Sequence, residues 1–500
     1  MAAKLVSIGD SLSHGFQHAA IRRSEWSYPA LVARALGAAE FRQSDFSGGG
    51  TGGPLIDLEL LMQRLSQTCG KNLDLWDLPA ALVAVHSLMD KVEDYWERGP
   101  GIQPSDTGPI HHNLAVWGFD VLDAQSLSDG VCRRHIGPPK DNVLAQIPES
   151  AMYRSARRVF NPAQVPDFAE QTPLRLARTL AEREGGIENL LLELGANNAL
   201  GTCVRLEIEW SEAADFDKLA HERSCTLWRP EHFSRLYRTL AEQAAEVGAE
   251  RVFLTTVPHV TIAPVVRGVS PGATPGHELE GGYYEYYTRF WIWDHDFDPR
   301  RHPHLSRAQA QLIDRTIDEY NACIVATARE RGWHVIDLCQ VLDDLAFRRN
   351  SGAPSYELPS GLVTALGANQ ETKFRVRPDG SVLLDTRYLR IPDRPPATDA
   401  PADTWRNAYK GGLFGLDGAH PTSTGYGLIA HEVLKAMRAA GVTEANPERL
   451  PWTAIVGADS LLREPPAILA SLARTLDVIF GKFAFERVIN KIAGLAPEKP

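Results

Sequence analysis

Five short apolar runs rich in β-branched residues, separated by long amphipathic stretches, constrain this 500-residue chain most strongly. Runs of this kind indicate strands that are buried on both faces, as the strands of a parallel sheet are. The longest stretches between them, 230–248 and 306–331, repeat apolar residues at helical spacing. Strands that alternate with helices predict an α/β fold with a parallel sheet and helices on both faces. The predicted strands are Lys4–Ile8, Asn113–Trp117, Asn189–Leu194, Arg251–Val257 and His334–Leu338.

The intervals between the predicted strands are uneven, which indicates insertions. A chain of this length corresponds to roughly three domains of about 150 residues, or to one domain with large insertions. We expect one domain over 1–442 and a helical extension over 443–500, because prolines break the pattern after residue 443 and an amphipathic segment follows. The expected insertions are 60–105, 265–305 and 345–412, the last with a hairpin of Lys373–Arg377 and Val382–Tyr388.

The charge balance argues against nucleic acid as a partner. Lysine and arginine number 52 and aspartate and glutamate 63, so the formal net charge is −11, and such a chain does not attract a polyanion. No run approaches the 18 or so apolar residues of a membrane span, so we expect no integral membrane segment. The six scattered cysteines form no CxxC motif, and the start of the sequence lacks a signal-peptide pattern. We therefore expect a cytoplasmic protein, although a trimmed signal peptide would leave the same start.

Residues with useful chemistry follow the predicted strands. Ser11 comes just after the first strand, where the carboxyl ends of a parallel sheet form the crevice for ligands; alone, it also fits a helix N-cap. Asp417 and His420 lie three residues apart on a loop before a predicted helix over 423–440. This spacing can place a carboxylate beside an imidazole and fix its tautomer. A helix start would explain the aspartate but not the histidine.

Two further positions suggest donors to an oxyanion. Asn197 and Asn198 follow the third predicted strand, where a side-chain amide can donate to a developing negative charge or can form an Asx turn. Gly118 follows the second predicted strand, and its backbone N–H is another possible donor or part of a tight turn. We assign the side-chain donor to Asn197 and expect Asn198 to begin the next turn.

The order Ser…Gly…Asn…Asp-x-x-His resembles the sequence blocks of the SGNH (GDSL) hydrolase family. The first block matches at Gly9-Asp10-Ser11-Leu12 and the last at Asp417-Gly418-Ala419-His420. Gly118 corresponds to the second block and Gly195-Ala196-Asn197-Asn198 to the third. The third block departs from the family at Asn198, where aspartate is usual, and the residues on either side of Gly118 are bulkier than usual.

The resemblance implies a flavodoxin-like three-layer α/β/α sandwich and serine esterase chemistry on a small-molecule or lipid-like ester, with no metal and no organic cofactor. It implies Ser11 as the nucleophile, His420 as its general base and Asp417 as the residue that orients the histidine. The oxyanion hole would consist of the backbone N–H groups of Ser11 and Gly118 together with the side chain of Asn197.

Three alternative functions stay open. A thioesterase or an acyltransferase would use the same Ser11. A degenerate hydrolase fold would act as a binding module, but it would be expected to have lost Ser11 or His420. A metallohydrolase would use Asp294-His295-Asp296-Phe297-Asp298 with His302 and His304, and would be sensitive to chelators. The sequence determines neither the natural ester nor the oligomeric state, because specificity lies in the insertions.

Two other motifs have competing interpretations. Gly268-Val269-Ser270-Pro271-Gly272 satisfies G-x-S-x-G, the nucleophile elbow of another hydrolase fold, but we expect no strand before it, and Pro271 opposes a following helix. The aromatic tract 283–293 is interpreted as a local core beneath an insertion, with a lid over the substrate as the alternative.

Overall fold

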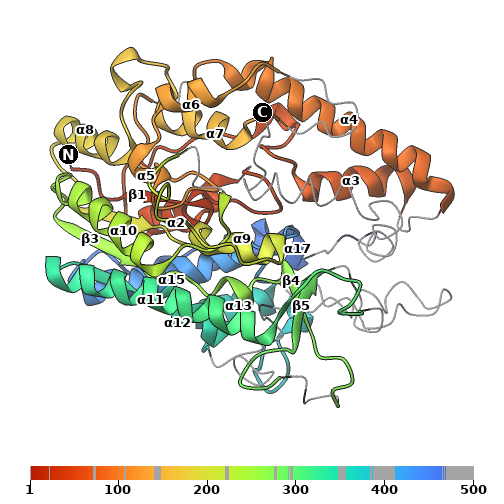
Figure 1. Ribbon diagram of the computed structural model, residues 1–500. Coiled ribbons are helices and arrows are strands. Elements are labelled where there is room, and N and C mark those ends of the chain that lie inside the picture. The colour runs from red at the N-terminus through yellow and green to blue at the C-terminus, as the bar shows by residue number, and fades with distance from the viewer. Residues whose placement is uncertain are drawn as a thin grey trace.

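A parallel sheet of four strands organises the chain in a computed structural model, in the spatial order β1-β2-β3-β7 (Figure 1). The strands are β1 (Val6–Gly9), β2 (Asn189–Glu193), β3 (Arg251–Thr255) and β7 (His334–Ile336). The predicted α/β fold with a parallel sheet is confirmed. The structure describes residues 2–21, 23–70, 75–105, 108–139, 148–219, 224–274, 277, 279–290, 292, 297–346, 356–382, 384, 386, 412–463, 466 and 468.

Helices cover both faces of this sheet. Successive residues of a strand point to opposite faces, so Leu190 and Leu192 join one hydrophobic core while Leu191 joins the other, beside Phe253 in register. The first core contains residues of α5 (Asp123–Ser126), α6 (Asp129–His135), α7 (Ala151–Phe160), α8 (Pro173–Glu184), α9 (Asn197–Arg205), α10 (Pro230–Ala245) and α11 (Arg307–Arg331). The second core contains residues of α1 (Ser11–His14), α2 (Tyr28–Ala35), α12 (Leu338–Leu345), α13 (Ser360–Ala368), α15 (Ser423–Ala439) and α16 (Trp452–Ala458).

The ends of the long helices follow local sequence signals. The side chain of Ser306 caps α11 and forms a reciprocal capping box with Gln309, which satisfies N–H groups that the first turn leaves without partners. The helix ends at Gly332, whose left-handed φ of 68° closes the last turn. Pro230 occupies the first turn of α10, where its missing N–H costs no hydrogen bond. The predicted helices over 306–331 and 230–248 are therefore present within a few residues.

The predicted strand Asn113–Trp117 is wrong as a strand, although it runs parallel to β1. One bridge joins Asn113 to Ser7, and the backbone N–H groups of Leu114 and Val116 donate to Ser7 and Gly9. The Asn113 side chain accepts from the N–H of Ala115 and from the hydroxyl of Ser7. The segment therefore follows β1 as the edge of the sheet without forming a regular strand.

With this edge segment counted as the second strand, the order along the sheet is 2-1-3-4-5 in chain order. Doubly wound flavodoxin-like folds have this order, and they bind ligands where it reverses, beyond the carboxyl ends of the first and third strands. Because the edge segment pairs through a single bridge, the flavodoxin-like topology stays a prediction. The reversal point lies between β1 and β2.

Each predicted insertion contributes additional elements. Residues 60–105 contain α3 (Leu58–Cys69) and α4 (Leu78–Glu97), which pack against each other at one end of the molecule (Figure 1). Residues 265–305 form a small antiparallel sheet of β4 (Val266–Val269), β5 (Tyr286–Arg289) and β6 (His304–Ser306).

The predicted hairpin in the third insertion is wrong in its first arm. Lys373–Arg375 is a 3-10 helix whose Arg375 is buried and donates to the Leu462 carbonyl, and one antiparallel bridge joins Val376 to Val382. Most of the second arm lies outside the described residues. Burial of a single arginine against the C-terminal segment therefore overrides the local strand pattern.

The C-terminal extension is helical as far as it is described. It contains α16 and α17 (Ser460–Arg463), and α16 packs against α13 and α15. The amphipathic segment predicted after residue 468 lies outside the described residues. Among the described residues, no helix combines the length and the apolar character that a bilayer crossing requires.

The aromatic tract belongs to the core where it is described. Tyr283 and Tyr287 are buried in the first core, and the Tyr283 hydroxyl donates to Asp314 on α11. Ser270 of the G-x-S-x-G motif follows β4 and accepts the N–H of Glu285. A strand does precede this serine, contrary to expectation, but it is an antiparallel strand of the inserted sheet. It lacks the strand-to-helix turn of a nucleophile elbow.

Candidate active site

The carboxyl end of β1 positions Ser11. Gly9 closes the strand, and a Cβ there would lie 2.7 Å from the Glu193 carbonyl of β2, so close packing between the strands requires glycine. Asp10 then caps the short helix α1 by accepting the N–H of Leu12 at 2.9 Å. Ser11 follows as the first residue of α1, and its side chain stands at the reversal point between β1 and β2.

Ser11, His420 and Asp417 come together across about 400 residues of sequence. The Ser11 Oγ lies 2.8 Å from the His420 Nε2. On the other side of the ring, Nδ1 lies 3.3 Å from the Asp417 Oδ2, an ion-pair contact that is longer and less well aligned than a good hydrogen bond. Contacts of this kind are often loose in active sites without substrate. The three residues form the chain serine–imidazole–carboxylate that the sequence predicts.

Asp417 is held as an anion by its loop. Its carboxylate accepts the backbone N–H groups of Ala19, Ala419 and His420 at 2.7–2.9 Å. Burial alone would raise the pKa of Asp417, but the charge of His420 and these hydrogen bonds outweigh it and lower the pKa to about 2. The following helix α15 is capped by Thr422 instead, so Asp417 is not needed as a helix cap.

Asn197 and Asn198 begin α9 at the carboxyl end of β2 but have different surroundings. The Asn197 Nδ2 donates to the Phe119 carbonyl at 2.8 Å, and its second contact, with the Asp10 Oδ2, is 3.4 Å long. An amide nitrogen has two donors, and the second N–H forms only this long bond to Asp10, which a better acceptor can replace. Asn198 is fully buried, and its Oδ1 accepts the N–H of Val121.

Gly118 contributes a left-handed turn next to this site. Its φ is 78°, which glycine adopts without strain. Neither its N–H nor that of Ser11 donates to another described residue. The preceding N–H, of Trp117, donates to the His14 Nδ1 at 3.2 Å. Burial lowers the pKa of His14 to about 3, so its ring stays neutral and its Nδ1 can accept this bond.

A buried pair of carboxyl groups lies behind Ser11. Glu193 accepts the Ser13 hydroxyl at 2.9 Å and shares a hydrogen bond with Asp10. Burial and the neighbouring Asp10 raise the pKa of Glu193 well above its ordinary value, whereas burial raises the pKa of Asp10 to about 6. Burial thus favours the protonated form of Glu193, which supports the start of α1 through its bond with Ser13.

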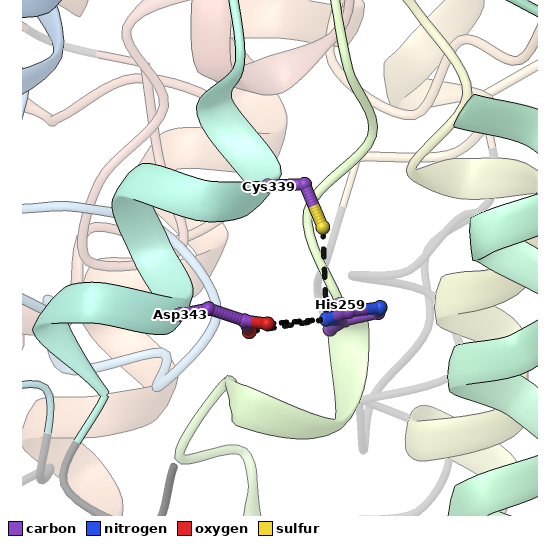
Figure 2. A group of neighbouring side chains, drawn as sticks. All are labelled: His259, Cys339 and Asp343. Carbon is purple, nitrogen blue, oxygen red and sulfur yellow. Dashed lines mark hydrogen bonds and ion pairs between the residues drawn. The ribbon is translucent and has the colours of Figure 1, made fainter. Parts of the chain in front are cut away.

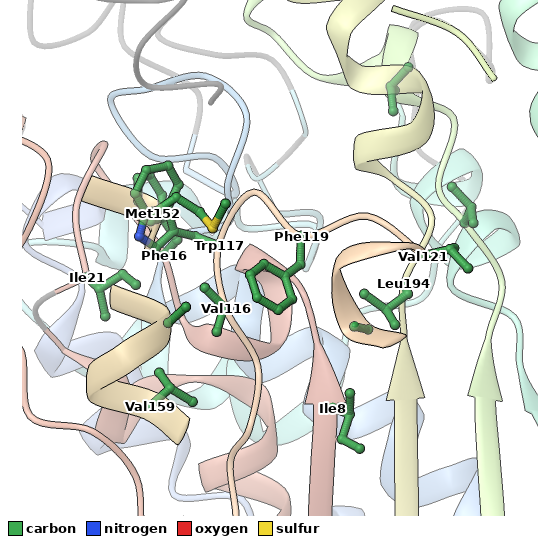
Figure 3. Packing of buried hydrophobic residues seen from close by; sticks show 14 of the residues in the cluster. Ile8, Phe16, Ile21, Val116, Trp117, Phe119, Val121, Met152, Val159 and Leu194 are labelled. Carbon is green, nitrogen blue, oxygen red and sulfur yellow. The ribbon is translucent and has the colours of Figure 1, made fainter. Parts of the chain in front are cut away.

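Aromatic side chains lie beside His420. The ring of Phe16 lies 4.6 Å from that of His420, centroid to centroid, and 5.5 Å from that of Trp117. Figure 3 shows Phe16 and Trp117 together with Met152 on the carboxyl side of β1. Ser11 and His420 are 6% and 9% exposed. In such a dry setting, fixed donors stabilise a developing charge more strongly than they do in water.

Sequence reasoning missed several of these residues. Nothing in the spacing of Glu193 indicated a buried acid with a raised pKa, because its surroundings include Asp10, 183 residues away. A second cluster, His259 with Cys339 and Asp343, lies at the carboxyl ends of β3 and β7. The sequence did contain signals for this cluster. His259 follows the predicted strand Arg251–Val257, and Cys339 and Asp343 lie four residues apart after the next predicted strand.

The tract 294–298, predicted as an alternative metal site with His302 and His304, is only partly described. Its residues Asp294-His295-Asp296 lie outside the described residues. Within the described chain, Asp298 pairs with Arg300, and its N–H donates to His302.

Contacts connect the five residues assigned from the sequence: Ser11 contacts His420, His420 contacts Asp417, and Asn197 donates to the carbonyl of Phe119, the residue after Gly118. Their arrangement unites a nucleophile, a base, a carboxylate and donors for an oxyanion. Comparisons of the chain with protein-family models, with curated proteins and with solved structures gave no match.

Proposed function

We propose that this chain is a serine hydrolase of the SGNH type that cleaves carboxylic esters through an acyl-enzyme. One observation carries the proposal: the 2.8 Å contact between the Ser11 Oγ and the His420 Nε2, with Asp417 at the opposite ring nitrogen. A serine hydroxyl is a weak nucleophile until an adjacent base takes its proton. The position of Ser11 also supports the proposal, because it follows β1 where the strand order reverses, and doubly wound folds bind their ligands at such a point.

Acylation begins when the Ser11 Oγ attacks the carbonyl carbon of the ester and His420 takes the hydroxyl proton. Asp417 stabilises the resulting imidazolium and fixes the ring orientation. The negative charge on the carbonyl oxygen is met by the N–H groups of Ser11 and Gly118 and by the second N–H of Asn197. The tetrahedral intermediate then collapses, and His420 gives its proton to the departing alcohol.

Deacylation repeats these steps with water. His420 takes a proton from a water molecule, whose oxygen attacks the acyl carbonyl carbon of the acyl-Ser11 ester. Collapse of the second intermediate breaks the bond to the Ser11 Oγ, and His420 returns the proton to it. The products are a carboxylic acid and the regenerated hydroxyl. A thiol ester would follow the same course, so the serine alone does not distinguish an esterase from a thioesterase.

The test is steady-state hydrolysis of p-nitrophenyl acetate and butyrate, run beside an acyl thioester. We expect the wild-type chain to hydrolyse the oxygen esters and Ser11→Ala to lose about 10⁴- to 10⁶-fold in kcat, because the serine acts as a unit with its base. Ser270→Ala is the matched control, since this serine belongs to the inserted sheet, and it should retain activity.

Retention of activity by Ser11→Ala, or absence of turnover on every ester by the folded wild type, would contradict the proposal. Turnover of the thioester alone would assign the same serine to a thioesterase. Circular dichroism of both variants shows whether a loss of rate reflects chemistry or folding.

A further inference from the structure

Three side chains with metal-binding atoms meet at the carboxyl ends of β3 and β7. His259 precedes a 3-10 turn after β3, and Cys339 and Asp343 are one helical turn apart on α12, which follows β7 (Figure 2). Strands lie about 4.8 Å apart, so this cluster is roughly 10–15 Å from the carboxyl end of β1. It takes no part in the proposed ester hydrolysis, and it is the one such group within the described residues.

The distances between the donor atoms suit a tetrahedral metal ion. The Cys339 Sγ lies 3.6 Å from the His259 Nδ1, and the Asp343 carboxylate oxygens lie 3.0 and 3.1 Å from the same nitrogen. One donor atom of each residue lies within 4.8 Å of the other two. Tetrahedral bonds of ordinary length to zinc would place such atoms roughly 3.4–3.6 Å apart, so the two distances to Nδ1 need to change by only a few tenths of an ångström.

The remaining ring nitrogen already has the partner typical of a metal-bound histidine. The His259 Nε2 lies 3.1 Å from the Asp318 carboxylate of α11. In metal sites the non-ligating nitrogen usually contacts a carboxylate, which fixes the tautomer and the ring orientation. His259 and Cys339 are buried and Asp343 is partly buried, as ligands of a bound ion are.

Hydrogen bonds hold the loop after β3 on both sides. The Thr256 Oγ1 donates to Asp337 at 2.8 Å and accepts the N–H of Cys339 at 2.9 Å, which ties the loop to the start of α12. On the other side, the Asn321 side chain of α11 bonds both the N–H and the carbonyl of Val257. The three donors are therefore positioned by the fold before any ion binds.

The same geometry argues against Cys339 as a nucleophile activated by His259. A thiol needs a ring nitrogen that can accept its proton. Here the Asp343 carboxylate lies closer to Nδ1 than the sulfur does, so Nδ1 carries its hydrogen toward Asp343 and does not accept the thiol proton. A metal ion bound at Nδ1 would replace that hydrogen, and the proton would leave to solvent. Asp318 occupies the other nitrogen.

A cavity of about 920 Å³ lies beside the cluster, between α11 and α12. Four acidic side chains and one basic side chain, Arg329, line this cavity; the acidic residues are Asp318, Glu330, Asp337 and Asp343. This charge favours a cation. The cavity also gives an ion a path of entry and leaves space for a water molecule at a fourth coordination position.

We propose that the His259 Nδ1, the Cys339 Sγ and a carboxylate oxygen of Asp343 bind one divalent transition-metal ion, with Asp318 orienting the histidine. Sulfur, nitrogen and oxygen donors at tetrahedral spacing favour zinc over magnesium or calcium, which prefer oxygen alone. A thiolate and a carboxylate balance the two charges of the ion. The ion would fasten the loop after β3 to α12 and keep one coordination position open to the cavity.

The test uses the full chain, stripped of metal with a chelator and dialysed. Zinc is titrated against a chromophoric chelator, and cobalt(II) is then added in its place to report on the ligands. We expect one equivalent of each metal to bind, and cobalt to give the charge-transfer absorption of a thiolate ligand. Cys339→Ser should lose this absorption and bind zinc more than about 100-fold more weakly, because even outer partners contribute 10- to 100-fold.

Cys323→Ser is the matched control, because Cys323 is a half-buried free cysteine of α11 that is not in the cluster. It should retain both the absorption and the affinity. Asp318→Asn should keep the absorption and lose about 10-fold in affinity, the low end of the range for outer partners, since this carboxylate is largely exposed. His259→Ala serves as a second ligand variant if Cys339→Ser fails to fold.

Absence of saturable zinc or cobalt binding by the wild type would overturn the proposal. So would a thiolate absorption that persists in Cys339→Ser or disappears in Cys323→Ser. Ser11→Ala should bind metal as the wild type does, so metal binding and ester hydrolysis can fail independently.

Discussion

Asn197 and Asn198 are neighbours in the chain but contact different parts of the molecule. Asn197 has one N–H in a short bond to Phe119 and the other in a long bond to Asp10 that an oxyanion can replace. Asn197→Ala should therefore lower kcat by about 10²–10³ with little change in KM, because the lost bond forms mainly in the transition state. Asn198 supports the turn at Val121, so Asn198→Ala should lower the free energy of unfolding by roughly 1–3 kcal/mol and leave kcat near normal.

Steady-state kinetics and chemical denaturation of both variants separate the two roles. If Asn198→Ala had the strongly reduced kcat and Asn197→Ala had a nearly normal one, the oxyanion donor would be Asn198 and not Asn197.

The acid limb of the rate profile should reflect His420. A protonated imidazole cannot accept the Ser11 proton, so kcat/KM should fall in acid solution. Asp417, with a pKa of about 2, stays ionised until the solution is far more acidic than the assay requires. Asp10 is the competing group, because burial raises its pKa to about 6.

Asp10→Asn distinguishes the two groups. This variant keeps an oxygen that can accept the N–H of Leu12 but no longer titrates. The acid limb should persist in it. If kcat/KM no longer depended on pH in Asp10→Asn, the acid limb would belong to Asp10. If it did not depend on pH in the wild type with a slowly bound substrate, His420 would not be the general base.

At the scale of elements, β2 and α1 meet through the buried pair Glu193 and Asp10. Because the pKa of Glu193 is raised in the fold, the folded state binds this proton more tightly than the unfolded state does. Above the unfolded value of about 4.3, stability therefore falls as the pH rises. Glu193→Gln removes the titration and retains a donor toward Asp10. It should raise the free energy of unfolding near pH 7, and the gain should shrink as the pH falls toward about 4 and vanish below that value.

Denaturation curves at several pH values test this prediction. Glu250→Gln is the control, because that side chain is 62% exposed, and its effect on stability should vary little with pH. A Glu193→Gln variant that is less stable at neutral pH would show that Glu193 is ionised in the fold.

The sequence predicts the regular elements well where local chemistry determines them. The strand predicted at Arg251–Val257 is β3, Arg251–Thr255, and the helix predicted at 306–331 begins one residue later with Ser306 as its cap. These elements are buried on both faces or carry clear caps, so neighbouring residues suffice to specify them.

The missed features depend on partners distant in sequence. The segment 113–117 lies at the sheet edge and pairs with β1 through a single bridge. Arg375 lies in a 3-10 turn and donates to a carbonyl 87 residues away. The positions of Ser11 and Asn197 were predictable because each follows a strand that local sequence specifies, whereas the cluster at His259 requires two strands to be placed side by side.

At the scale of the whole molecule, one edge of the sheet carries two separate sets of reactive side chains. Ser11 and Asn197 follow β1 and β2, where the strand order reverses, and the proposed metal ligands follow β3 and β7. Parallel strands explain this arrangement, because all their carboxyl ends meet at the same edge. The two sets can therefore be changed independently.

The most direct test of the central claim is covalent labelling of the full chain with a fluorophosphonate, followed by mass mapping of the modified peptide. The reagent reacts with a serine that an adjacent base activates. We expect one label, on Ser11, that is lost in Ser11→Ala and His420→Ala and kept in Ser270→Ala. A label on Ser270, or an unchanged label in the Ser11→Ala variant, would contradict it.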